Sequence, residues 1–203
     1  MPKLYYPVLL SLLALFISQT TCAGEPDAGK AKSQLCAACH GADGNSPNPV
    51  WPNLAGQHEE YLLKQLMDFK SGKRQNAQMS PMASPLTEQD MEDLAAYFAT
   101  QSHKKGVAKS GDIELGETLY RAGNPKTGLV ACMACHGPTG AGNPAAKYPA
   151  LAGQHADYTA LQLKAFKSES RNNDINSVMR TIAGKMTNAE IDAVAGYIQG
   201  LYE

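Results

Sequence analysis

The sequence contains one short motif twice, and its residue types are those that attach a large cofactor. Cys-x-x-Cys-His-Gly occurs at residues 36–41 and again at residues 132–137. Two cysteines three residues apart lie on the same side of a helical turn, so each can form a thioether with a vinyl group of a porphyrin. The next residue, a histidine, can then bind the iron. We therefore expect two covalently bound haem c groups, with thioethers at Cys36, Cys39, Cys132 and Cys135 and iron ligands at His40 and His136.

Paired cysteines also serve other purposes. In an exported protein they can form disulfides. Four thiolates can also bind one zinc ion, but Cys39 and Cys132 lie much further apart than the short spacing of a zinc ribbon allows. Neither alternative explains why a histidine and a glycine follow both cysteine pairs.

The two motifs belong to a longer internal repeat. Residues 52–74 align with residues 149–171, and both segments contain LAGQH. Residues 86–101 align in the same way with residues 186–201. Such self-similarity predicts two homologous units.

The boundaries of these units follow from the repeat. We expect an N-terminal unit at residues 24–102 and a C-terminal unit at residues 112–203, joined by a linker at residues 103–111. The second unit carries an insertion at residues 122–130, between its first helix and its motif.

The repeated segments have the apolar spacing of helices. One stripe of four residues occurs in the last segment of each unit, and no stretch alternates with the period of a strand. Thr87 with Asp90, and Thr187 with Glu190, have the spacing of capping boxes that begin a helix. We therefore expect an all-α fold. The stripes are Met91, Leu94, Ala95 and Phe98, and Ile191, Val194, Ala195 and Ile198.

Residues 1–23 are predicted to be a signal peptide. Lys3 precedes an apolar run at residues 8–18 that is short for a membrane span, and Thr21 and Ala23 fit the cleavage pattern. A retained membrane anchor and a lipidated Cys22 are the alternatives. The signal predicts export to the periplasm, and a net charge of −1 gives no basic surface for nucleic acid.

A second iron ligand is expected from the methionines that follow each motif, because methionine is the usual partner of histidine in cytochromes c. Alignment of the last helices places Met79 opposite Met179. Met82 faces Ile182, and Met186 faces Leu86, so these two methionines are interpreted as packing residues. The predicted axial ligands are therefore Met79 and Met179.

Two further pairs repeat in the same way. His58 and His155 could complete a bis-histidine haem, or could lie at the start of a helix without touching iron. A ligating histidine normally donates its other N–H to an acceptor. The carbonyls of Pro52 and Pro149 are candidates for that role, and a simple turn proline is the alternative.

Taken together, these residues resemble the cytochrome c4 family, which consists of di-haem class I cytochromes c. The resemblance rests on CxxCHG, P-x-LAGQ, YxxxQL, the methionine and the closing helix, and it covers roughly residues 24–203. It implies two tandem domains related by a pseudo-twofold axis, and iron ligation by His40 with Met79 and by His136 with Met179. It also favours Pro52 and Pro149 as acceptors.

The expected function is electron transfer rather than catalysis, because iron with protein ligands on both sides has no open position for a substrate. The resemblance implies a periplasmic di-haem electron carrier. We expect it to be a monomer, with peripheral membrane association left open. Its redox partners would be a donor such as a quinol-oxidising complex and an acceptor such as a membrane oxidase or reductase. A cytochrome subunit of a larger oxidoreductase, such as a sulfide-oxidising flavocytochrome, is the alternative. A di-haem peroxidase is a third reading, which the matched methionines disfavour.

Overall fold

The computed structural model describes residues 24–109 and 111–202, so the predicted signal peptide at residues 1–23 lies outside the described residues. Every regular element in the described ranges is a helix, and only two isolated β-bridges occur there. The expected all-α class is confirmed. None of these helices has the length and apolar character needed to cross a membrane.

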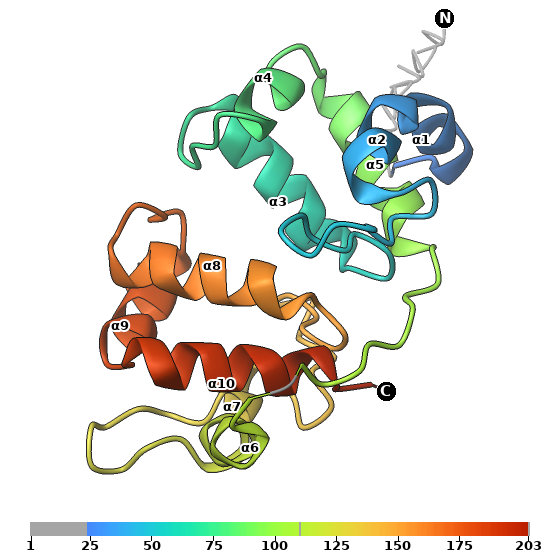
Figure 1. Cartoon of the computed structure of the whole chain (residues 1–203). Coiled ribbons are helices and arrows are strands. Elements are labelled where there is room, and N and C mark those ends of the chain that lie inside the picture. Colours follow the sequence, from blue (N-terminus) through green and yellow to red (C-terminus); the bar gives the residue numbers. More distant parts are fainter. Residues whose placement is uncertain (1–23, 110, 203) are drawn as a thin grey trace, which may run out of the picture.

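Both halves of the chain have the same helix order, and they lie next to each other with α3 and α8 on the facing sides (Figure 1). The first half contains α1 (Pro26–Lys32), α2 (Gln34–His40), α3 (Glu59–Lys70), α4 (Met79–Ala83) and α5 (Glu88–Ala99). The second half contains α6 (Ile113–Ala122), α7 (Met133–His136), α8 (Ala156–Lys167), the short 3-10 helix η1 (Ile175–Ser177), α9 (Val178–Gly184) and α10 (Asn188–Gln199).

Each half has its own small apolar core, built around its last helix. The two predicted stripes are buried, with Leu94 and Phe98 in the first core and Val194 and Ile198 in the second. Both predicted capping boxes are present at the starts of α5 and α10. The inserted segment of the second half folds back on itself through a bridge between Asn124 and Leu129.

The first and last helices of each half cross at a glycine. A Cβ atom at Gly29 of α1 would lie 1.9 Å from the carbonyl oxygen of Asp93 in α5. A Cβ atom at Gly116 of α6 would lie 2.3 Å from the carbonyl oxygen of Ala193 in α10. The absence of a side chain therefore lets each pair of helices pack backbone against backbone.

Gly116→Ala should destabilise the second half, although alanine is the better helix former. The added methyl group meets backbone atoms that cannot move away as a side chain would, and such overpacking costs about 1–3 kcal/mol. Chemical denaturation of the haem-loaded protein measures the loss. Gly184→Ala is the matched control, because a Cβ atom there has no neighbour within 4 Å. Equal stabilities for the two variants would contradict the close crossing.

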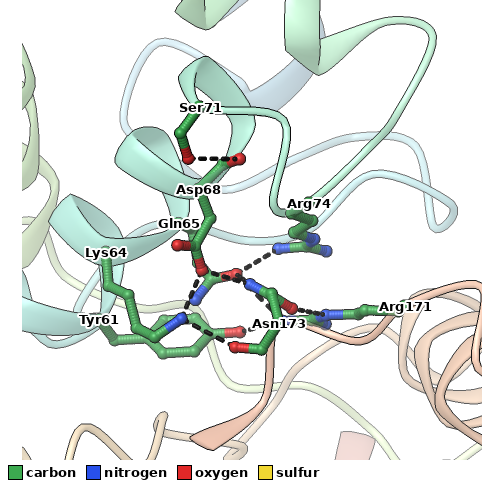
Figure 2. Close-up of polar contacts among 8 residues, drawn as sticks. All are labelled: Tyr61, Lys64, Gln65, Asp68, Ser71, Arg74, Arg171 and Asn173. Carbon is green, nitrogen blue, oxygen red and sulfur yellow. Dashed lines mark hydrogen bonds and ion pairs between the residues drawn. The ribbon is translucent and has the colours of Figure 1, made fainter.

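A buried polar cluster joins the two halves (Figure 2). Arg171 of the second half reaches into the first, where it donates hydrogen bonds to Tyr61 Oη at 3.0 Å and to Gln65 Oε1 at 3.1 Å. Its guanidinium also stacks on Phe166 of its own half, 4.4 Å from the ring centroid. Arg171 is only 8% exposed, so these contacts replace its solvation by water.

The equivalent arginine of the first half makes the reciprocal contacts. Arg74 donates to Tyr158 Oη at 3.1 Å and to Gln162 Oε1 at 2.8 Å in the second half. It stacks on Phe69 of its own half at 4.6 Å. Residues that align in the repeat therefore make equivalent contacts across the interface, as a pseudo-twofold relation between the two halves requires.

The segment that connects the halves is bound along the second half. Val107 accepts a hydrogen bond from Gln199 at 2.8 Å, and the N–H of Lys109 donates to the carbonyl of Gly196 at 3.2 Å. Lys105 lies over the ring of Tyr202. The connection thus follows α10 and adds to the contacts that hold the halves together.

Candidate functional site

Each Cys-x-x-Cys-His motif ends a short helix. His40 is the last residue of α2, and His136 is the last residue of α7. The glycine that follows has a positive φ in both cases, 79° at Gly41 and 77° at Gly137. Side chains other than glycine rarely adopt this conformation, which explains why a glycine follows the histidine. The turn directs the chain toward the segment that contains Pro52 or Pro149.

Both motif histidines are buried and are oriented by a backbone carbonyl. His40 is 5% exposed, and its Nδ1 lies 2.9 Å from the carbonyl oxygen of Pro52. His136 is 8% exposed, and its Nδ1 lies 3.0 Å from the carbonyl oxygen of Pro149. A carbonyl only accepts, so Nδ1 carries the proton in each ring. The other ring nitrogen, Nε2, is then the one that can bind iron.

Burial also sets the charge of these rings. It lowers the pKa of His40 and of His136, mainly because the charged form loses its hydration, and the proline carbonyl opposes the shift only in part. The neutral imidazole is the form that binds a metal. Tautomer and charge therefore both fit an axial ligand.

The surroundings of the first cysteine in each motif do not favour a thiolate. None of the four forms a disulfide. Burial raises the pKa of Cys36, and it raises the pKa of Cys132 to about 11. Redox-active and metal-binding cysteines have lowered pKa values. No group of three or more potential metal-binding side chains occurs within residues 24–109 and 111–202, so a zinc site gains no support from the geometry.

The two predicted methionine ligands occupy matching places. Met79 begins α4, and its N–H donates to Oδ1 of Asn76 at 2.9 Å. Met179 is the second residue of α9 and packs against the second apolar core. Both methionines are half-buried. Each thus lies in the short helix that follows the long helix α3 or α8.

The other two methionines differ from each other. Met186 is 3% exposed and belongs to the second core, which confirms its interpretation as a packing residue. The same interpretation is wrong for Met82, which is 41% exposed. Met82 lies three residues after Met79, on a side of the short helix α4 that the rest of the domain leaves open.

His58 and His155 lie at the helix starts, but they act across the interface. Nε2 of His58 is 2.7 Å from the carbonyl oxygen of Ala141, and Nε2 of His155 is 2.9 Å from the carbonyl oxygen of Ser46. Each histidine thus contacts the loop that follows the opposite motif. These bonds occupy Nε2 of each ring, so that nitrogen is not available to bind iron.

The sequence did not predict that the LAGQH segments would form contacts between the two halves. The signal was present, because LAGQH is identical in both halves, but a repeat does not distinguish contacts within a unit from contacts between units. The linker residue His103 also meets one of these segments, since a Cβ atom at Gly153 would lie 2.2 Å from its Nε2.

Comparisons with known proteins agree with this site. The family model described as Cytochrome c matches the chain twice, at residues 27–102 and 113–202. Cytochrome c4 of Thiocapsa roseopersicina is 54% identical over 180 residues, which cover 88% of this chain and 93% of that protein. Cytochrome c4 of Pseudomonas aeruginosa is 46% identical over 203 residues, which cover 100% of both chains.

A solved structure is similar over most of the chain. The crystal structure of reduced recombinant cytochrome c4 from Pseudomonas stutzeri has a TM-score of 0.86 and 47% sequence identity. The similarity covers 89% of this chain and 100% of that chain. The two-domain arrangement described above is therefore shared with it.

Proposed function

Because this chain belongs to the cytochrome c4 family of di-haem electron carriers, we propose that it transfers electrons between redox proteins of the periplasm. It carries two covalently bound haem c groups, one on each Cys-x-x-Cys-His motif. A bound haem c exchanges single electrons through its iron. The protein residues hold and orient that group.

The observation that carries the proposal is the matched pair of buried histidines. In each half, a proline carbonyl fixes the protonated Nδ1, so that Nε2 points away from it. We assign the axial ligands as His40 with Met79 and His136 with Met179, and the thioethers as the four motif cysteines. The functional units are the domains at residues 24–102 and 112–203, with residues 103–111 as the linker.

Ligation from both sides leaves the iron no open coordination position, so the protein has no substrate of its own under this proposal. The proposed redox partners are a periplasmic donor, such as a quinol-oxidising complex, and a terminal oxidase or reductase.

The test is a redox titration of the purified protein, followed by absorption and by electron paramagnetic resonance. We expect two one-electron transitions and two low-spin ferric signals, because each iron has two strong protein ligands. A high-spin signal, or binding of an added small ligand to the resting ferric protein, would contradict the proposal. Gel filtration of the native protein should give the size of a monomer. A stable larger complex would favour the flavocytochrome type of function instead.

A further inference from the structure

We infer that Gln57 and Gln154 are positioning residues, each of which tunes the haem ligand of the opposite domain through a single peptide group. This inference rests on the proposed iron ligation by His40 and His136. It concerns residues that lie outside the cysteine motifs and the predicted methionine ligands.

The contact in the second domain begins at His136. Its Nδ1–H donates to the carbonyl of Pro149 at 3.0 Å. The N–H of the same peptide group belongs to Ala150, and it donates to Oε1 of Gln57 at 2.9 Å. Nε2 of Gln57 returns a hydrogen bond to the carbonyl of Ala150 at 2.9 Å. One peptide thus joins the ligand of the second domain to a side chain of the first.

The first domain has the same arrangement with the roles exchanged. The Nδ1–H of His40 donates to the carbonyl of Pro52 at 2.9 Å. The N–H of that peptide, on Asn53, donates to Oε1 of Gln154 at 2.9 Å, and Nε2 of Gln154 donates to the carbonyl of Asn53 at 2.9 Å. Two independent copies of the contact therefore have nearly equal distances.

Local bonds hold each glutamine amide in the required orientation. Oε1 of Gln57 also accepts the N–H of His58 at 3.0 Å, and Oε1 of Gln154 accepts the N–H of His155 at 3.0 Å. Each oxygen therefore lies between two N–H donors, which fixes it as the acceptor and the nitrogen as the donor. Gln57 is 7% exposed and Gln154 is 8% exposed, so water competes little for these bonds.

The physical effect follows from cooperativity between hydrogen bonds. A peptide whose N–H is bonded has a more polarised carbonyl, and that carbonyl is a stronger acceptor. A stronger acceptor at Nδ1 draws the proton away from the imidazole and makes the ring a more basic ligand. A more basic ligand stabilises ferric over ferrous iron. Each glutamine should therefore lower the reduction potential of the haem in the other domain.

Replacement of one glutamine should change the opposite haem alone. In Gln57→Leu we expect the C-terminal haem to become easier to reduce, and the His136 Nδ1–H proton resonance of the ferrous protein to move to lower frequency. Because cooperative strengthening is of the order of 10–30% per bond, the ferric-to-ferrous ratio at a fixed potential should fall by about 1.5-fold. The N-terminal haem lies in the same domain as Gln57, and its reduction potential and the Nδ1–H resonance of His40 should not change.

Gln154→Leu is the matched variant, and it should affect His40 and the N-terminal haem instead. Gln57→Glu keeps an acceptor for the N–H of Ala150 but loses the donor to the carbonyl of Ala150, so the His136 resonance should move less than it does in Gln57→Leu. The haems are assigned by comparison with Met79→Ala and Met179→Ala. The interface itself should survive, because the contacts of Arg74 and Arg171 remain.

Two results would overturn the inference. One is an equal change at both haems in each leucine variant, which would indicate a general loosening of the interface. The other is no change, or a change at the haem of the same domain. A spectrum of the unmodified protein distinguishes failure of this inference from failure of the proposed function. Its ferrous spectrum must contain an Nδ1–H resonance for each of two low-spin haems before any variant is compared.

Discussion

The double variant Cys132→Ser/Cys135→Ser should contain one covalently bound haem where the unmodified protein contains two. A serine hydroxyl does not form the thioether that joins a cysteine to a haem vinyl group, so the second motif loses both attachment points. Mass spectrometry of the purified polypeptide should show the mass of one haem fewer. The haem absorbance per chain should fall by about half, because one of two equivalent groups is lost.

The reciprocal variant, Cys36→Ser/Cys39→Ser, should lose the other haem. Cys22→Ser is the matched control, because Cys22 lies outside both motifs and within the predicted signal peptide, and it should leave both haems in place. Two haems retained in either double variant would contradict attachment through these cysteines. A variant that fails to fold would carry no haem, a result that mass spectrometry distinguishes from one haem.

Met179→Ala should remove about half of the weak near-infrared absorption that arises from sulfur bound to ferric iron, because it deletes one of two sulfur ligands. The reduction potential of the C-terminal haem should fall, since methionine raises the potential of haem iron relative to other ligands. Met79→Ala should remove the other half of the band and lower the potential of the N-terminal haem. Absorption spectra of the ferric protein and a redox titration measure both effects.

Met82→Ala is the control for this experiment. Met82 lies one helical turn from Met79 but aligns with Ile182, which cannot bind iron, so its loss should leave the band intact. If Met82→Ala weakens the band and Met79→Ala does not, the alignment of the two halves that selected Met79 is wrong.

Much of this architecture could be predicted because its signals are local. The cysteine motif specifies its cofactor through spacing alone, and the apolar stripes and capping boxes specify where α5 and α10 begin and which side they bury. Comparison of the two halves also separated Met186, a core residue, from the predicted ligand Met179.

The remaining features depend on which parts of the chain meet. Exposure of Met82 follows from what the neighbouring elements leave uncovered, and its apolar character gives no information about that. The contacts of Gln57, His58, Gln154 and His155 cross between halves, whereas the sequence shows only that each segment repeats. The role of the proline carbonyls as acceptors could be predicted more easily, because each proline lies a short distance along the chain from its histidine.

The reciprocal contacts of Gln57 and Gln154 are those of a symmetric homodimer, in which residue i of one subunit meets residue j of the other and the reverse. A chain of half this length, with the same residues, can make all of these contacts with a second copy of itself. Joining the two copies in one chain makes their association independent of protein concentration, and it allows each copy to change without the other. The loop closed by Asn124 and Leu129, present only in the second half, is such a change. A single chain can therefore keep the reciprocal interface of a dimer while its two halves differ in their loops.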